Sequence, residues 1–371
     1  MALAAGLANF TAPHAGRKLR HDLGFLAAFW GEDGDAVLVD DTAHAATAYR
    51  QTLHDMARLV PSQLAKTPSV TFVDQKQLVH THRLEGVEPW GWDAALKALL
   101  LRKGVDERLL PTDEQLVQIR QLSSRHLSAW LLGRLKSISP AVTVGEACEC
   151  RTMEEVRGLA ARYGEMVLKA PWSSSGRGIR YLSGDGSVAG TDPQYARSPL
   201  ATLEGWLRNL LDKQGSVMVE PYYNKVKDFG MEFFSDGRGG ISYKGLSLFH
   251  TENGAYTGSI IATEAAKRQV LASHIAPSLL DDVCSAVCRE LGSMFCGKYR
   301  GPFGIDMMLV RSQAPAQPFL HPCVEVNLRR TMGHVALTLG ELMNAGDDDE
   351  LRHVMRIDYT GNNYQLKIRR L

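Results

Sequence analysis

The sequence predicts an α/β protein, with α+β character in its later part, that contains more than one hydrophobic core. Two observations support this fold class. The chain has 371 residues, of which 44% are hydrophobic and 22% charged, and short apolar segments alternate with amphipathic helical stretches along most of it. A chain of this length and composition buries more than one core, so we expect two or three packed subdomains.

The first third of the chain has the pattern of an open α/β unit. Residues 36–41 (AVLVDD) and 69–74 (SVTFVD) read as short buried strands that end in acids. Between them, the stretch ATAYRQTLHDMARLV places apolar side chains such as Leu53 and Met56 on one helical face. We place an N-terminal α/β domain at residues 1–115.

Three further stretches predict helices. WDAALKALLLRKG ends at Gly104, and DEQLVQIRQLSSRHLSAWLLGRLKSI reads as one helix entered through Thr112. RTMEEVRGLAARYG ends at a glycine and leads directly into the strand-like segment EMVLKAP. We place a second domain at residues 116–220 and a third at 221–371.

Charge and composition exclude several classes of protein. Forty-two Lys and Arg residues against 41 Asp and Glu give a net charge of +1, without the large basic excess that usually accompanies nucleic-acid binding. The apolar N-terminal run is short and precedes its positive charges, the reverse of a secretory signal, and no window is long enough to span a bilayer. Six cysteines form no CxxC pair. We expect a cytoplasmic protein with no nucleic-acid or membrane partner.

A serine- and glycine-rich loop lies between two strand-like segments in VLKAPWSSSGRGIRYL. Because its lysine precedes the loop and a strand follows it, the segment is not a P-loop. Small residues still allow the main chain to approach phosphate oxygens closely, and a strand lysine supplies a point charge. The alternative interpretation is an exposed hairpin turn with a surface lysine. The residues concerned are Lys169, Ser174, Ser175, Gly176 and Gly178.

A second group of polar residues lies on two predicted strands, FGIDMMLV and PCVEVNL, which we expect to form a hairpin. If the faces coincide, Asp306 converges with Glu325 and Asn327. Two buried acids require a cation, and three oxygen ligands indicate Mg²⁺. Arg329 and Arg330 follow at once and would hold an anionic substrate or a transferring phosphoryl group. The alternative is that both acids face solvent.

Between these two groups, VMVEPYY reads as an apolar strand that ends at Glu220 and Pro221. We expect Pro221 to stop regular pairing and to leave main-chain groups free for the edge of a nucleobase. KDFGMEFF, which carries Asp228, and GISYKGLSLF then predict two neighbouring strands.

The order of these motifs resembles that of the ATP-grasp superfamily. The shared features are the strand lysine with its glycine loop, VMVEPYY as an interdomain hinge, and an acid on one strand followed by Glu-x-Asn-x-Arg on the next. LKAPWSSSGRGIRYL and EVNLRR resemble segments of biotin-carboxylase-like members. The resemblance covers about residues 123–330. It implies a pre-ATP-grasp-like domain at 1–115, a small lobe with the glycine loop at 116–220, and a large lobe with the metal site at 221–371.

The resemblance also implies cofactors and roles for individual residues. The cofactors are ATP and Mg²⁺, with Mn²⁺ as a substitute. Lys169, Arg329 and Arg330 would be catalytic, and Asp306, Glu325 and Asn327 would bind the metal. The nucleotide would be bound by Arg125, where the family commonly has a lysine, and by Lys169, Ser174, Ser175, Gly176, Gly178, Glu220, Tyr222 and Asp228.

The implied reaction joins a carboxylate to an amine. A carboxylate attacks the γ-phosphate of ATP, and an amine or similar nucleophile opens the resulting acyl-phosphate, releasing ADP and phosphate. The substrates would be small-molecule or peptide carboxylates and amines. Two alternatives stay open: a phosphotransferase on the same scaffold and a non-catalytic nucleotide-binding sensor.

Three residues and one surface have no decided role in the sequence. His334 is either a substrate contact or a cap at a helix N-terminus, and Asn253 and Tyr256 lie where a substrate loop is expected. The apolar residues of SSRHLSAWLLGRL would let the chain pack against a second copy as a homodimer.

Overall fold

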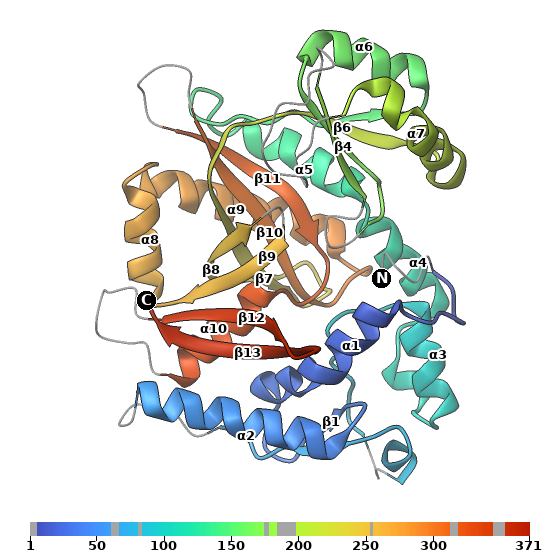
Figure 1. Cartoon of the computed structure of the whole chain (residues 1–371), viewed down its shortest axis with the longest axis vertical. Coiled ribbons are helices and arrows are strands. Elements are labelled where there is room, and N and C mark those ends of the chain that lie inside the picture. The colour runs from blue at the N-terminus through green and yellow to red at the C-terminus, as the bar shows by residue number, and fades with distance from the viewer. Residues whose placement is uncertain are drawn as a thin grey trace.

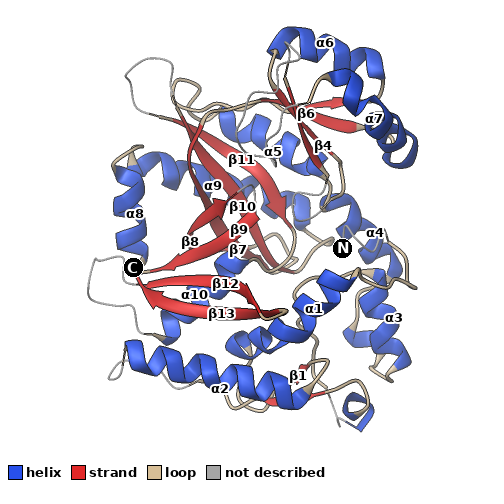
Figure 2. Cartoon of the chain, viewed as in Figure 1, coloured by secondary structure: helices blue, strands red, loops and turns tan. Residues whose placement is uncertain are grey.

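The computed structural model describes residues 6–60, 67–80, 84–173, 178–183, 198–252, 255–311, 318–343 and 353–371. Within them the chain forms one large sheet, one four-stranded sheet and a two-stranded pair. Figure 1 shows the small four-stranded sheet at the upper right, the large sheet in the centre and the N-terminal helices below it. Helices surround the strands of the large sheet (Figure 2).

The N-terminal region contains the predicted α/β unit. Strands β1 (Ala36–Leu38) and β2 (Thr71–Val73) pair in parallel and are connected through helix α2 (Thr42–Leu59). Asp41 caps α2 by accepting a hydrogen bond from the His44 N–H at 2.9 Å. The remaining elements here are α1 (His14–Leu23), η1 (Gly24–Trp30), η2 (Gln77–His80), α3 (Ala94–Arg102) and η3 (Glu107–Leu109).

The prediction of one long helix after Thr112 is wrong. The structure has two helices there, α4 (Asp113–Leu122) and α5 (Arg125–Lys136). The Ser124 hydroxyl caps α5 by accepting from the His126 N–H, and the Arg125 N–H donates to the Pro171 carbonyl at 3.0 Å. The break therefore depends on a tertiary contact as well as on a local cap. Its consequence is that Arg125 begins a new helix.

The small sheet has the strand order β3-β6-β4-β5. Its pairing corrects one prediction. Pro221 pairs opposite Met166, and the Tyr222 N–H donates to the Glu165 carbonyl at 3.0 Å, so strand pairing continues through the proline. Its elements are β3 (Cys148–Cys150), β4 (Met166–Lys169), β5 (Ile179–Leu182), β6 (Val217–Pro221), α6 (Met153–Tyr163) and α7 (Leu200–Gln214).

The large sheet has seven antiparallel strands in the order β11-β10-β7-β8-β9-β12-β13. One face packs its apolar side chains against α5 and α9, where Phe233 stacks on Phe303. The start of α10 covers part of the other face. The elements are β7 (Lys225–Ser235), β8 (Ile241–Glu252), β9 (Ala255–Ile261), α8 (Glu264–Ala272), α9 (Pro277–Phe295), β10 (Gly301–Val310), β11 (Phe319–Asn327), α10 (Met332–Leu342), β12 (His353–Thr360) and β13 (Asn363–Arg370).

The hydrophobic cores do not follow the order of the chain. α1, η1 and α2 share a core with α10 and with Leu366 and Ile368 of β13. The four leucines of α5 belong to the core of the large sheet, so most of the apolar surface on which the homodimer prediction relied is not free, although Trp130 is exposed. The homodimer and the boundaries at residues 115 and 220 stay predictions.

Among the described helices, none alone is long and apolar enough to cross a membrane. α8 and α9 meet the length and composition criteria only together, as a pair bent by 117°.

Candidate active site

The predicted hairpin brings its polar residues together. β10 pairs with β11 so that Asp306 lies directly opposite Glu325, and the Asn327 amide donates to Asp306 at 2.9 Å. The amide oxygen of Asn327 accepts from Arg329, also at 2.9 Å. The two strand faces therefore coincide as the sequence predicted, and Arg329 is held beside the acids. We call Asp306, Glu325 and Asn327 the acid face.

The electrostatics of the acid face favour a cation. Burial, followed by the charges of Glu325 and Glu232, raises the pKa of Asp306 to about 8, although Arg329 opposes the shift. Asp306 is only partly buried, so an ion can reach it from solvent. Carboxylate and amide oxygens are the hard ligands that Mg²⁺ prefers, so these residues fit that metal.

Lys169 and Glu220 lie on the facing strands β4 and β6 of the small sheet. They form a buried ion pair with a 2.6 Å separation between Nζ and Oε2. The sequence assigned both residues to the nucleotide, and the structure shows them paired with each other. Such a pair holds the ammonium in place on a rigid strand, where phosphate oxygens would be its alternative partners.

Arg125 connects the small sheet to the acid face. Its guanidinium donates to the Ala170 carbonyl and to the Ser173 hydroxyl, each at 2.6 Å, and to Glu325 at 3.0 Å. The side chain is 5% exposed, and its Nε has no hydrogen-bond partner within the described part of the chain. Arg125 thus places a buried positive charge between the start of the glycine loop and the acids.

Ser174, Ser175 and Gly176 of the predicted nucleotide site lie outside the described residues, as does Asn253 of the expected substrate loop. Gly178 is described, and its carbonyl accepts from the Ala170 N–H at 2.8 Å. A Cβ at Gly178 would lie 2.3 Å from the Ser173 Cβ, so only glycine fits this turn.

Tyr222 and Asp228 lie farther along the hinge and the strand that follows it. The Tyr222 ring packs edge-on against Tyr181. Asp228 accepts from the Thr251 hydroxyl at 2.8 Å and pairs with Lys225. Their roles in binding ribose and adenine stay predictions.

Arg330 points away from the acid face toward the N-terminal region. Its guanidinium lies over the Trp30 ring at 4.5 Å and contacts Glu88 at 3.3 Å, while the main-chain N–H of Arg330 donates to the Trp90 carbonyl. The structure does not bring it to the acids, so its predicted catalytic role has no geometric support. Beside it is a small hollow of about 40 Å³, lined in part by Trp90, Trp92, Phe234, Pro302 and Arg330.

The sequence left two roles open for His334, and the structure shows one of them. His334 caps α10 through a reciprocal pair of hydrogen bonds with Thr331, as one interpretation expected. Tyr256 lies against the N-terminal core and hydrogen-bonds Ser259 at 2.8 Å.

Two residues near the acid face were not singled out from the sequence. Glu232 on β7 is 3% exposed, and His321 on β11 is fully buried with neither ring nitrogen bonded within the described residues. Burial, followed by the charge of Lys169, lowers the pKa of His321 to about 3, so it is neutral. A charged or polar residue inside an apolar strand, as in KDFGMEFF and FLHPCVEVN, was the available signal.

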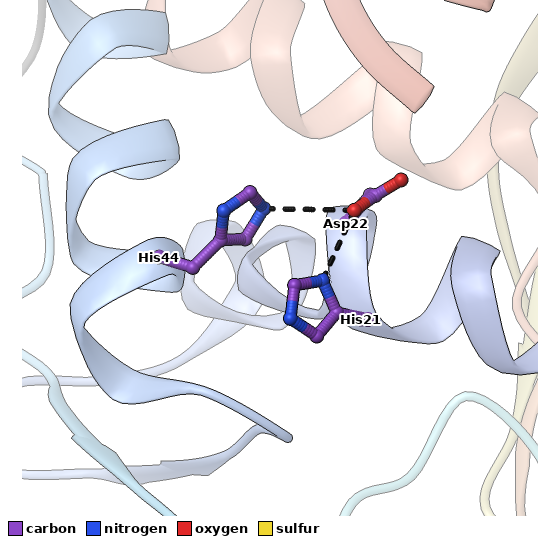
Figure 3. Close-up of side chains that lie close together, drawn as sticks. All are labelled: His21, Asp22 and His44. Carbon is purple, nitrogen blue, oxygen red and sulfur yellow. Dashed lines mark hydrogen bonds and ion pairs between the residues drawn. The ribbon is translucent and has the colours of Figure 1, made fainter. Parts of the chain in front are cut away.

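A separate polar cluster joins α1 and α2 (Figure 3). His21 Nδ1 lies 3.0 Å and His44 Nε2 lies 3.8 Å from one oxygen of the buried Asp22. The same oxygen accepts from Lys18 at 2.7 Å, and the other accepts from the Tyr364 N–H at 2.8 Å. Because an ammonium already neutralises the carboxylate, this cluster serves to connect α1, α2 and β13.

No protein family and no curated protein matches the chain by sequence. Solved structures do match it. The biotin carboxylase of Campylobacter jejuni, solved as a β,γ-ATP complex, aligns with a TM-score of 0.51 at 11% identity, over 94% of this chain and 75% of that one. The biotin carboxylase domain of Hydrogenobacter thermophilus 2-oxoglutarate carboxylase, with MgADP and bicarbonate, gives 0.48 at 13% identity, over 87% and 68%.

The likeness to the Campylobacter jejuni enzyme establishes the fold. The chain has the ATP-grasp fold, as the order of its motifs predicted, with mixed helix and sheet. Because the identity is 11%, the similarity is one of architecture.

Proposed function

We propose that this protein is an ATP-dependent ligase that activates a carboxylate as an acyl-phosphate and couples it to an amine or similar nucleophile. One observation carries the proposal: Arg125 bridges the start of the glycine loop and Glu325, so the segment predicted to bind phosphate and the acid face meet at one buried cation. The structurally similar biotin carboxylase was solved as a β,γ-ATP complex, which supports a nucleotide as the ligand.

Different residues of the chain would have different roles in phosphoryl transfer. Asp306, Glu325 and Asn327 would hold one or two Mg²⁺ ions, which neutralise phosphate charge during the transfer. Lys169 and Arg125 would bind phosphate oxygens from the side of the small sheet. Arg329, fixed by Asn327, would face the transferring group.

The nucleotide site is tested first by thermal melting with and without Mg²⁺-ATP. A ligand at one hundred times its dissociation constant stabilises the folded state by about 2.7 kcal/mol, which raises the melting temperature by a few degrees. We expect this shift in the wild type and in Glu154→Ala, a control at an exposed helix position. Glu325→Ala should lose it. An equal shift in both variants would show that the acid face does not bind the nucleotide's metal.

The reaction is tested with Mg²⁺-ATP and hydroxylamine over a panel of carboxylic acids. A ligase yields ADP, phosphate and an acyl hydroxamate, because hydroxylamine traps acyl-phosphates. A phosphotransferase would instead yield ADP and a product that retains the phosphate, without free phosphate. The absence of ADP with every acid would contradict the proposal.

A further inference from the structure

Arg125 is paired with a carboxylate that the proposed function assigns to the metal. Its Nη2 donates to Glu325 Oε1 at 3.0 Å, and the Arg125 side chain is 5% exposed whereas that of Glu325 is 32% exposed. Among the ion pairs of the described residues, this one alone reaches a carboxylate of the acid face. Arg329, the other cation beside the acids, binds the neutral amide of Asn327. Arg125 therefore competes with a metal ion for Glu325.

The other contacts of Arg125 hold it to the segment that leads into the glycine loop. Its Nη1 donates to the Ala170 carbonyl and to the Ser173 hydroxyl, each at 2.6 Å, and its main-chain N–H donates to the Pro171 carbonyl at 3.0 Å. The contact with Glu325 is the longest that the guanidinium makes, and it is the one that crosses to the large sheet. Glu325 is therefore the partner that Arg125 can exchange while it stays bound to the loop segment.

The guanidinium of Arg125 also has a donor to spare. Its Nε is buried, and no acceptor within the described part of the chain bonds it. A buried N–H without an acceptor costs free energy, and a guanidinium fork binds phosphate oxygens in pairs. A phosphate chain beside Arg125 would supply acceptors both for Nε–H and for the N–H that Glu325 releases.

A free metal ion and a metal ion with bound phosphates meet different charges at Glu325. A free ion either displaces Arg125 or shares the carboxylate with it, so two cations lie close together and repel each other. Displacement also leaves a buried guanidinium without an anion, which is costly. Nucleotide phosphates bring the negative charge that replaces Glu325 as the partner of Arg125. Lys169 takes no part in this competition, because its carboxylate is that of Glu220 on the small sheet.

We infer that Arg125 makes the acid face selective for a metal ion that binds together with nucleotide phosphates over the free metal ion. This inference rests on the nucleotide site proposed above, and it gives Arg125 a role besides phosphate binding. Arg125 keeps Glu325 paired until phosphate oxygens replace the carboxylate, and Glu325 is then available to the metal. Metal and nucleotide therefore raise each other's affinity by the same factor, through one side chain.

The test measures the binding of Mn²⁺, a paramagnetic substitute for Mg²⁺, through the EPR signal that the free ion loses when it binds. The wild type and Arg125→Met are titrated with Mn²⁺ alone, and again with Mn²⁺ and the β,γ-methylene analogue of ATP. We expect Arg125→Met to bind Mn²⁺ alone about 10-fold more tightly than the wild type or better, because the competing cation is gone. The analogue should raise the Mn²⁺ affinity less in this variant than in the wild type.

Two controls show whether the effect comes from Arg125 and Glu325. Arg134→Met changes another arginine of α5, whose side chain is 60% exposed, and should leave both affinities at the wild-type values. In a Glu325→Gln background, Arg125→Met should improve the binding of Mn²⁺ alone much less, since the carboxylate for which both cations compete is absent. An equal gain in both backgrounds would overturn the inference.

The outcomes distinguish this inference from the proposed function. Equal affinity for Mn²⁺ alone in the wild type and Arg125→Met, with analogue-dependent binding retained, would overturn only the selectivity of Arg125. Failure of the wild type to bind Mn²⁺ even with the analogue would overturn the nucleotide site as well.

A measurement on the wild type alone covers the case in which Arg125→Met does not fold. Thermal melting is recorded in EDTA, with Mg²⁺ alone, and with Mg²⁺ and the β,γ-methylene analogue of ATP. We expect Mg²⁺ alone to leave the melting temperature close to its value in EDTA, and Mg²⁺ with the analogue to raise it. A shift with Mg²⁺ alone as large as the shift with both would mean that the free ion has full access to the acid face, and would overturn the inference.

Discussion

Two polar clusters in this chain each contain an aspartate, buried in one and partly buried in the other, and the surrounding groups shift the pKa of the two carboxyls in opposite directions. Burial alone would raise the pKa of Asp22, but hydrogen bonds from Lys18, the Tyr364 N–H and His21 outweigh it and hold that pKa below its usual value. At the acid face, burial and two further acids raise the pKa of Asp306 instead.

The opposite pKa shifts distinguish a cluster whose charges are balanced within the fold from one whose charges are not. Asp22 has its counter-charge and its main-chain donor within the fold, so the cluster needs nothing more. Asp306 lies near Glu325 and Glu232, and the positive charge of Arg329 offsets them only in part. Such a concentration of acids destabilises the metal-free fold and is typical of sites that bind a cation.

The largest expected effect comes from Asp306→Asn. It removes a metal-binding carboxylate, so ADP formation with Mg²⁺-ATP should fall by about 10²-fold or more. Asp22→Asn should leave this rate near that of the wild type. Steady-state assays of both variants decide the point. A similar loss of activity in Asp22→Asn would remove the contrast between the clusters.

Asp22→Ala should instead affect stability. It leaves Lys18 and the Tyr364 N–H without their acceptor, which we expect to cost about 3 kcal/mol of unfolding free energy. Urea denaturation measures this cost. Asp306→Asn, a variant that relieves repulsion, should be no less stable than the wild type at pH 8 without metal. The comparison fails if both variants lose stability equally.

The two clusters should also differ in their pH dependence. Asp306 has a raised pKa in the folded state, so it costs nothing below its unfolded value near 4, and its penalty grows as the pH rises toward about 8. In EDTA, the wild type should lose on the order of 2 kcal/mol relative to Asp306→Asn over this range, allowing for partial exposure. Asp22 behaves in the opposite sense, because its stabilisation is lost as the pH falls. If the melting temperatures of the wild type and Asp306→Asn changed in parallel from pH 5 to 8, the raised pKa would not belong to Asp306.

The smallest expected effect is that of Ser124→Ala. Loss of the α5 cap should cost about 1 kcal/mol, measured by thermal unfolding, with the fold retained. Because Arg125 follows the cap and contacts Glu325, this variant should weaken Mg²⁺-ATP binding slightly. Thr263→Ala, the matching cap variant of α8, should lose similar stability with no change in ATP binding.

The acid face was predictable because alternation along a strand fixes which side chains share a face. Asp306, Glu325 and Asn327 needed only the correct register of one hairpin. The break before Arg125 was not predictable, because helical periodicity continues through it and the contact with Pro171 comes from another element. Glu232 and His334 meet only through the packing of α10 on the sheet, which no local pattern encodes.

The shared core of α1, α2 and β13 has a consequence for synthesis of the chain. The Tyr364 N–H donates to Asp22 across 342 positions of sequence, and Leu366 and Ile368 complete the same core. On the ribosome, the N-terminal helices emerge long before these partners exist. Their apolar faces therefore stay open during most of translation, when a chaperone that binds exposed hydrophobic segments would have its best access to this protein.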